Sequence, residues 1–228
     1  MLLDLLALSS EKVTALIGGG GKTTLLWRLA ACCAEQGERV LVTTSTHILP
    51  PLAGQCSRVV QPGPLVRQAA QQPGITAALS KGPGGKCTGL PAASFPDARA
   101  WTDRLLYEAD GARRLPLKVH AAHEPALCPG TDAVLFLMGL SALGRPLAEV
   151  CHRFALVPAF AAAPERPVTP EDCLLLAQRA FAAAGCPPHF GVILTQADLA
   201  SAQQAQAALG LLRGAGFRTT ALALKPYA

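Results

Sequence analysis

Hydrophobic and polar residues follow one another in blocks that predict strands and helices in alternation. Short, mainly apolar runs typical of buried parallel strands lie at residues 13–17, 39–44, 104–107, 132–139, 190–194 and 217–224. Longer stretches with leucine or alanine at helical spacing lie at residues 23–35, 169–184 and 201–213. Because strands that alternate with helices form parallel sheets covered by those helices, the pattern predicts a three-layer α/β fold with a mostly parallel sheet.

The stretch between the second and third of these strands carries weaker signals. Two short strands and a short helix are predicted at residues 58–60, 75–79 and 64–72. A Gly-Gly-Lys sequence ends at Lys86, but Pro83 lies just before it and no helical pattern follows, so we expect a hairpin or a mobile loop over residues 80–88. We therefore predict a single domain over residues 1–228, with a small hairpin insertion within residues 56–100.

Composition narrows the class of protein. A chain of 228 residues, 50% of them hydrophobic, can bury one large core. No apolar run is long enough to span a bilayer, and the first residues carry Asp4 and no basic region, so we expect no membrane partner and a cytoplasmic location. The net charge of +5 is mild and the basic residues are scattered, so we expect no nucleic-acid partner. The eight cysteines form no Cys-x-x-Cys pair, which favours reduced, buried thiols over a catalytic or sulfur-carrying cysteine.

The main chemical signal is a run of four glycines between the first strand and the first helix. Lys22, Thr23 and Thr24 follow this run and open the helix. Glycines let main-chain N–H groups approach an anion closely, and the start of a helix adds free N–H donors. Lys22 suits terminal phosphates and the Thr23 hydroxyl suits Mg²⁺, so the run predicts a phosphate-binding loop in a P-loop-type domain. The predicted nucleotide-binding residues are Gly18, Gly19, Gly20, Gly21, Lys22, Thr23 and Thr24, and Lys22 is also a catalytic candidate.

This loop is shorter than the usual P-loop. The usual pattern places four residues between its first glycine and the Gly-Lys pair, and that position here is Leu16, inside the strand. The nearest usable glycine is Gly18, which gives a shortened loop similar to that of the Mur ligases. The alternative is a glycine-rich turn with a chance lysine. We expect Lys22 to be exposed, because it lies in a loop at the start of a helix.

Two carboxylates follow the strand at residues 104–107. Glu108 and Asp110 come at its C-terminal end, where ligands bind in open α/β sheets, and their spacing of two predicts one shared strand face. A carboxylate there suits Mg²⁺ or the polarisation of a water molecule. We therefore predict Glu108 and Asp110 as catalytic and metal-binding residues, with Thr23 as a further metal ligand. The alternative is a charged turn.

Three further polar stretches have two interpretations each. Residues 43–46 carry hydroxyls that suit Mg²⁺ or ordered water, or else reflect ordinary strand propensity. Residues 113–125 supply cations for an anionic ligand, and we expect them to face the phosphate loop, with Lys118 binding a cofactor. The alternative is a surface loop with incidental charges. Asp198 lies where P-loop GTPases carry the aspartate that binds guanine, but Gln196 replaces the usual lysine. We predict base binding by Asp198, with a helix N-cap as the alternative.

Together these stretches resemble the YqeC-type family of accessory proteins for selenium-dependent molybdenum hydroxylases. The resemblance covers nearly the whole chain, and its most specific part is Glu-Ala-Asp-Gly-Ala at residues 108–112. The other matching stretches are the glycine loop, Val-Thr-Thr-Ser-Thr-His-Ile, Pro-Leu-Lys, His-Glu-Pro, Met-Gly-Leu-Ser-Ala-Leu-Gly-Arg-Pro and a His-Arg pair. The resemblance implies a role in maturing the molybdenum cofactor or in inserting selenium into it.

The residues and the resemblance leave three interpretations. The first is an Mg²⁺-dependent nucleotide-binding protein that hydrolyses ATP or GTP and assists a molybdenum hydroxylase or its cofactor-maturation proteins. The second is a chaperone that binds a nucleotide, or the phosphate of the molybdenum cofactor, without hydrolysis. The third is an ATP-dependent transferase or ligase, which the Mur-like loop suggests.

Overall fold

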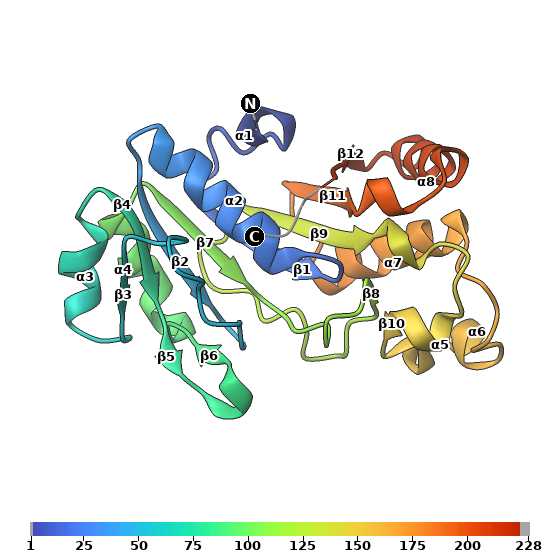
Figure 1. Cartoon of the computed structure of the whole chain (residues 1–228), viewed down its shortest axis with the longest axis horizontal. Coiled ribbons are helices and arrows are strands. Elements are labelled where there is room, and N and C mark those ends of the chain that lie inside the picture. Colours follow the sequence, from blue (N-terminus) through green and yellow to red (C-terminus); the bar gives the residue numbers. More distant parts are fainter. Residues whose placement is uncertain (1, 224–228) are drawn as a thin grey trace. The chain divides into compact units, whose positions relative to one another are not determined.

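A computed structural model describes residues 2–223 of the chain (Figure 1). Contacts between Cα atoms divide these residues into two compact units. The first unit comprises residues 2–16, 23–111 and 126–133. The second unit comprises residues 17–22, 112–125 and 134–223. Each unit has its own parallel strands and helices.

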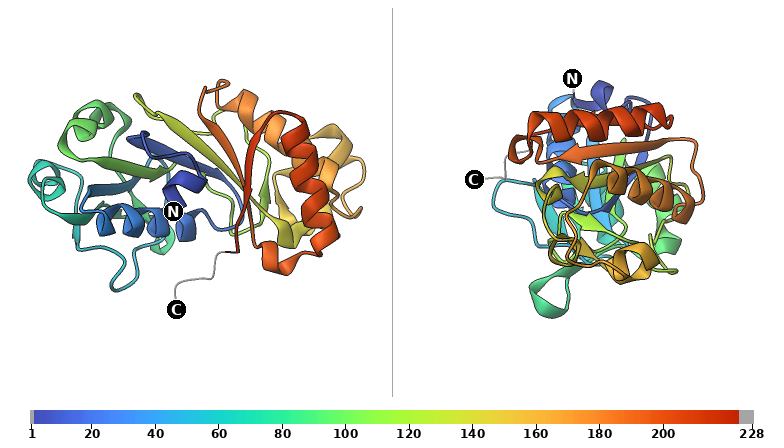
Figure 2. Two further views of the ribbon diagram at one scale, coloured as in Figure 1. Left: turned by 90° about the horizontal axis from the view of Figure 1, so that it is seen from above. Right: turned by 90° about the vertical axis from the view of Figure 1, so that its right-hand side faces the viewer.

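The first unit contains five parallel strands in the order β1-β7-β2-β4-β3. Their bounds are β1 Val13–Gly18, β2 Arg39–Thr44, β3 Arg58–Val60, β4 Gly74–Ala78 and β7 Arg104–Glu108. The helices are α1 Leu2–Leu5, α2 Lys22–Glu35, α3 Leu65–Ala70 and α4 Phe95–Trp101. Helices α2 and α4 lie on opposite faces of these strands (Figure 2). Strands β1 and β7 are buried along their whole length because both faces are covered.

The second unit contains the parallel strands β9, β11 and β12 in that order. Their bounds are β9 Ala133–Gly139, β11 Phe190–Thr195 and β12 Arg218–Ala221. A separate parallel pair joins β8 Leu117–Lys118 to β10 Cys151–His152. The helices are α5 Leu147–Val150, α6 Pro158–Ala161, α7 Pro170–Ala183 and α8 Ala202–Gly214. Helix α7 packs against α8, and four phenylalanine rings form a cluster in this unit at positions 136, 181, 190 and 217.

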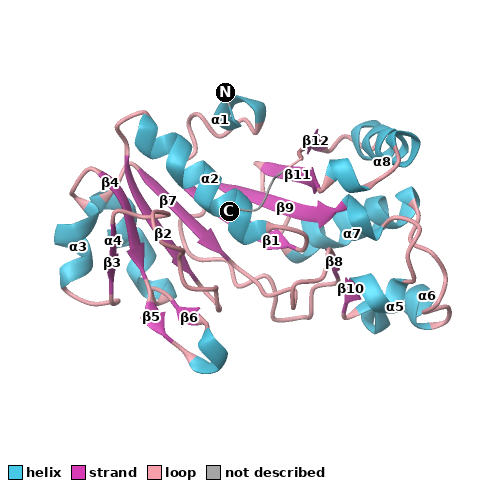
Figure 3. Ribbon diagram, viewed as in Figure 1, coloured by secondary structure: helices cyan, strands magenta, loops and turns pink. Residues whose placement is uncertain are grey.

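The predicted α/β class with a mostly parallel sheet flanked by helices is confirmed. Helix α7 begins with the capping box that its sequence indicates, in which Thr169 and Asp172 bond each other's backbone. The hairpin expected at residues 80–88 is present as the antiparallel strands β5 Ser80–Lys81 and β6 Cys87–Thr88 (Figure 3). The sequence patterns predict no helix at the position of α4, which is only seven residues long; Pro96 lies in its first turn, where proline is tolerated.

The last strand covers residues 218–221 rather than 217–224, and residue 224 lies outside the described residues. The single domain over residues 1–228 stays a prediction. No described helix is long and apolar enough to cross a membrane, and the cytoplasmic location also stays a prediction.

Candidate functional site

The glycine run forms the turn that carries the chain from β1 into α2. Gly18, Gly20 and Gly21 have φ angles of 93°, 73° and 105°, a region that glycine adopts without the steric cost of a Cβ atom. Gly19 is needed for a different reason, because a Cβ atom there would lie 2.6 Å from the Leu115 carbonyl oxygen. The loop therefore requires glycine both for its backbone angles and for close approach by a neighbouring segment.

That neighbouring segment belongs to residues 113–125. The Gly20 N–H donates to the Leu115 carbonyl at 3.2 Å, and the Gly19 N–H donates to the Leu137 carbonyl at 2.9 Å. Pro116 accepts a further bond from the Gly139 N–H at 2.9 Å. Leu115 and Pro116 therefore lie against the loop as expected, while the facing of the rest of residues 113–125 and their recognition of a second ligand stay predictions.

These bonds also reduce the number of backbone N–H groups that could donate to a bound phosphate. The amides of Gly19 and Gly20 are used within the protein, so the donors available to an anion come from Gly21 and the first turn of α2, which includes Thr24. Lys22 is only 6% exposed, and its Nζ donates to the Gly18 carbonyl at 2.5 Å. The expectation that Lys22 is exposed is therefore wrong, because its side chain turns back onto the loop.

Thr195, which no sequence motif marks as a loop contact, supports the loop from the end of β11. The Thr195 hydroxyl donates to the Gly20 carbonyl and lies 3.2 Å from the Met138 carbonyl. Thr195 is also the first residue of the stretch 195–198, which resembles the base-binding motif of P-loop GTPases. The last residue of this stretch, Asp198, is exposed. Ser201, not Asp198, caps helix α8, because its side chain accepts the Gln204 N–H. Base binding by Asp198 stays a prediction.

In the first unit, the end of β7 meets the first turn of α2. The Thr23 hydroxyl donates to Glu108 Oε1 at 2.5 Å, and Glu108 is 4% exposed. Strand β7 ends at Glu108, so Asp110 lies beyond the strand, where it is fully buried. The Ala109 N–H still donates to the Leu16 carbonyl of β1 at 3.0 Å, and the shared face of Glu108 and Asp110 stays a prediction. The metal role of Asp110 stays a prediction.

The hydroxyl-rich end of β2 has a structural use. The Thr43 hydroxyl donates to the Ala78 carbonyl at 3.0 Å, and the Thr44 hydroxyl donates to the Glu108 carbonyl at 2.9 Å. The Ser45 N–H bonds the same Glu108 carbonyl at 3.1 Å. These hydroxyls hold neighbouring strands together, and this arrangement favours the structural interpretation of residues 43–45 over metal binding.

Thr23 and Glu108 offer oxygen ligands, which Mg²⁺ prefers. Within residues 2–223, no three His, Cys, Asp or Glu side chains lie close enough together to hold a metal ion. Mg²⁺ bound with a nucleotide is held by one or two carboxylates together with phosphates and water, and the oxygen atoms of Thr23 and Glu108 fit this set of ligands.

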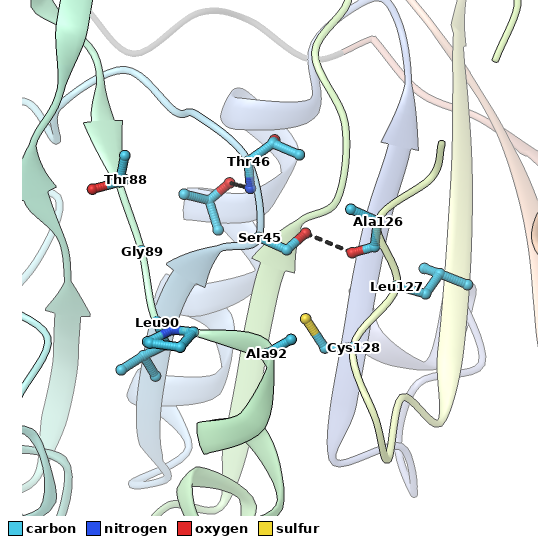
Figure 4. Close-up of a pocket in the computed structure, with 11 residues that line it drawn as sticks. Ser45, Thr46, Thr88, Gly89, Leu90, Ala92, Ala126, Leu127 and Cys128 are labelled. Atoms are coloured by element: carbon cyan, nitrogen blue, oxygen red, sulfur yellow. Dashed lines mark hydrogen bonds between the residues drawn. The ribbon is translucent and has the colours of Figure 1, made fainter. Parts of the chain in front are cut away.

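A pocket of about 350 Å³ lies in the first unit, beside the end of β2 (Figure 4). Its lining carries hydroxyls, apolar side chains and a thiol but no charged group, and comprises residues 44–46, 88–92 and 126–128. Ser45, which bonds Glu108, also donates to the Ala126 carbonyl at 2.6 Å in the pocket wall. Burial raises the pKa of the Cys128 thiol to about 11, although hydrogen bonds with Ser45 and Tyr107 oppose it. Cys128 is thus a neutral thiol at neutral pH and unsuited to nucleophilic attack.

Lys118 lies in the second unit, where its side chain is fully buried. Its Nζ is 2.9 Å from Glu124 Oε1. Lys118 is therefore occupied by an ion pair within the protein, and direct contact with a cofactor stays a prediction.

The profile of the YqeC protein family matches residues 14–155 of the chain. The chain belongs to the YqeC family. An uncharacterized YqeC protein of Escherichia coli (strain K12) is 34% identical in an alignment 167 residues long, which covers 68% of this chain and 62% of that protein, less than two thirds of its length. The YqeC match contains every predicted site residue except Asp198.

Two solved structures also resemble this YqeC chain. Chloroplast FtsY from Physcomitrella patens has a TM-score of 0.46 at 19% identity, over 92% of this chain and 58% of that one. The MinC:MinD cell division complex of Aquifex aeolicus has a TM-score of 0.46 at 13% identity, over 94% of this chain and 82% of that one. Both TM-scores lie below 0.5, so the fold assignment rests on the strands and helices of the chain itself.

Proposed function

We propose that this YqeC chain binds a nucleoside triphosphate together with Mg²⁺. The observation that carries the proposal is the hydrogen bond between the Thr23 hydroxyl and the Glu108 carboxylate. In P-loop NTPases, the loop hydroxyl and a carboxylate at a strand end hold the same Mg²⁺ ion. Two further features support the proposal: Thr23 follows the loop lysine directly, and Glu108 ends a buried parallel strand.

The remaining roles follow from the loop. Lys22 and the amides from Gly21 to Thr24 would bind the phosphates of ATP or GTP, and Thr23 and Glu108 would hold the metal. When bound, Mg²⁺ supplies charge neutralisation at the phosphate oxygens. Glu108 or Asp110 would orient a water molecule for hydrolysis.

The test compares two substitutions that remove an Mg²⁺ ligand with one that keeps it. Thr23→Val and Glu108→Gln should each lower Mg²⁺-dependent ATP or GTP affinity at least about tenfold in calorimetric titrations, because each removes a metal ligand. Thr23→Ser keeps the hydroxyl and should bind like the parent. Asp97→Asn, at an exposed carboxylate on α4, is the matched control for lost charge. If Mg²⁺ dependence persists in both Glu108→Gln and Asp110→Asn, the metal assignment fails.

We also propose that nucleotide hydrolysis serves maturation of the molybdenum cofactor, or selenium insertion, for a molybdenum hydroxylase. The support is the family membership together with the role that the resemblance implies. Phosphate release should rise when a molybdenum hydroxylase is added and should be lost in Glu108→Gln. Nucleotide binding without release in either condition would instead select the chaperone interpretation.

The uncharged pocket supports a second candidate function, an ATP-dependent transferase. Ser45 bonds both the Glu108 carbonyl and the pocket wall, so an acceptor held there would lie beside the candidate metal ligand. The Thr46 hydroxyl, also in the pocket lining, is buried and has no hydrogen-bond partner within residues 2–223. Ala92→Phe should fill the pocket and block formation of a phosphorylated or adenylylated product, detected by mass, while nucleotide binding persists. Finding no such product with the parent protein would remove this candidate.

A further inference from the structure

A cluster of charged side chains lies in the second unit, around the short pair of strands β8 and β10. Glu124 accepts a bond from Lys118 Nζ at 2.9 Å through one carboxylate oxygen, and from the Arg153 guanidinium through the other. The Ala121 N–H donates to the carboxylate as well, at 3.3 Å. Lys118 pairs in register with His152, so the strand pair brings these side chains together from segments about 30 residues apart.

This cluster has more positive than negative charge. The causes that lower the pKa of His152 are burial first, and then the charges of Arg153, Lys118 and Arg113. Glu124 is the carboxylate that acts in the other direction. Lys118 and Arg153 share the single carboxylate of Glu124, and the exposed Arg113 adds a third positive charge that acts on His152. An excess of positive charge in a partly buried place favours the binding of an anion.

The donors that remain for a ligand come from two arginines and the histidine. The side chain of Lys118 is 0% exposed and faces Glu124, so it does not reach solvent. The Arg153 side chain is 31% exposed, and Arg113 is exposed. A guanidinium carries five N–H groups, so Arg153 keeps donors beyond the one that bonds Glu124.

The backbone of these residues is strained. Arg113, Arg114 and Arg153 have φ angles of 50°, 63° and 61°, a left-handed conformation that costs free energy in residues other than glycine. Strained residues of this kind concentrate at ligand sites. Two of these three arginines, Arg113 and Arg153, are the ones that supply the remaining donors.

We infer that Arg113, His152 and Arg153 form a site for a doubly charged phosphate group on a second ligand. Near neutral pH a phosphate monoester approaches two negative charges, and guanidinium forks match phosphate oxygens in geometry. Glu124 anchors Arg153, and the buried Lys118 holds Glu124. The site uses no residue of the phosphate loop, so it stands whether or not that loop binds nucleotide.

The experiment uses the Lys22→Ala variant of the full chain, which weakens the loop as a competing phosphate site. Inorganic phosphate is titrated at constant ionic strength and followed by calorimetry and by the His152 imidazole NMR signal. Phosphate should bind, and the pKa of His152 should rise on saturation because an anion stabilises the imidazolium. Adding Arg113→Gln or Arg153→Gln should lower phosphate affinity at least about tenfold, as expected for a charge-assisted hydrogen bond.

Two controls make the result specific. Arg145→Gln removes an exposed arginine of the same unit, which is paired with Glu149, and should leave phosphate affinity unchanged. Acetate carries one charge and should bind more weakly than phosphate. Because Arg113 is exposed, its substitution should leave the thermal unfolding curve unchanged, so folding is checked independently.

Three outcomes would overturn the inference. They are a lack of phosphate binding to Lys22→Ala, an affinity unaffected by both arginine substitutions, and acetate binding as tight as that of phosphate. Failure of the nucleotide proposal looks different, because it appears as a lack of ATP and GTP binding to the parent protein.

Discussion

At the scale of single residues, the chain contains two lysines that each follow a pair of glycines. Lys22 is buried and bonds the Gly18 carbonyl, whereas Lys86 is exposed on the β5–β6 hairpin. Lys22→Ala should lower ATP or GTP affinity at least about tenfold, because a charge-assisted contact to phosphate is lost. Lys86→Ala is the matched control and should bind like the parent in the same titration. Equal affinity in all three proteins would contradict the loop assignment.

The ion pairs of Glu124 should make the stability of the protein depend on pH. Burial acts to raise the pKa of its carboxyl, but the bond from Lys118 and the charges of Lys118 and Arg153 hold that pKa below its ordinary value of 4.5. A lowered pKa means that the stability from these ion pairs is present above about pH 4.5 and is lost as the pH falls through the folded value.

Denaturant unfolding at several pH values checks this. At pH 7, Glu124→Gln should lower the free energy of unfolding by roughly 3 kcal/mol, because Lys118 stays buried without its partner. The difference from the parent should shrink toward pH 3. Glu149→Gln, in an exposed pair with Arg145, should change stability by less than about 0.5 kcal/mol at either pH. A constant difference between pH 7 and pH 3 would contradict the role given to Glu124.

At the scale of elements, the phosphate loop and the segment through Leu115 and Pro116 form one packed arrangement. A methyl group at Gly19 would meet backbone atoms of both residues at 2.6–2.7 Å. Gly19→Ala should therefore push the segment away, lower the free energy of unfolding by about 2 kcal/mol and weaken nucleotide binding. Gly210→Ala, in the open middle of α8, should instead raise stability by about 0.5–1 kcal/mol. Chemical denaturation of both variants measures the predicted opposite signs.

At the scale of the whole molecule, ligand binding should appear as added stability. A ligand that binds only the folded chain raises the free energy of unfolding by about 2.7 kcal/mol when present at 100 times its dissociation constant. Mg²⁺ with ATP or GTP should therefore raise the melting temperature of the parent and have little effect on Lys22→Ala. A shift of equal size in both proteins would show that the nucleotide binds elsewhere.

Much of the fold and part of the candidate site could be predicted from the sequence because they depend on neighbouring residues. Buried strands appear as apolar runs, and the Thr169–Asp172 cap marks the start of α7. The glycine loop with Thr23, and the carboxylate Glu108, could be located in the same way, because each lies at or just after the end of a buried strand.

Only the tertiary structure decided which distant segments meet. The Thr195 hydroxyl reaches the Gly20 carbonyl across 175 residues, and the Ser45 hydroxyl joins the pocket wall across 81 residues. The pairing of Glu124 with Arg153 and the burial of Lys22 likewise result from packing. Periodicity along the chain specifies which face of an element is apolar, but it does not specify the partner that covers that face. These contacts therefore depend on how the elements pack, which no local pattern records.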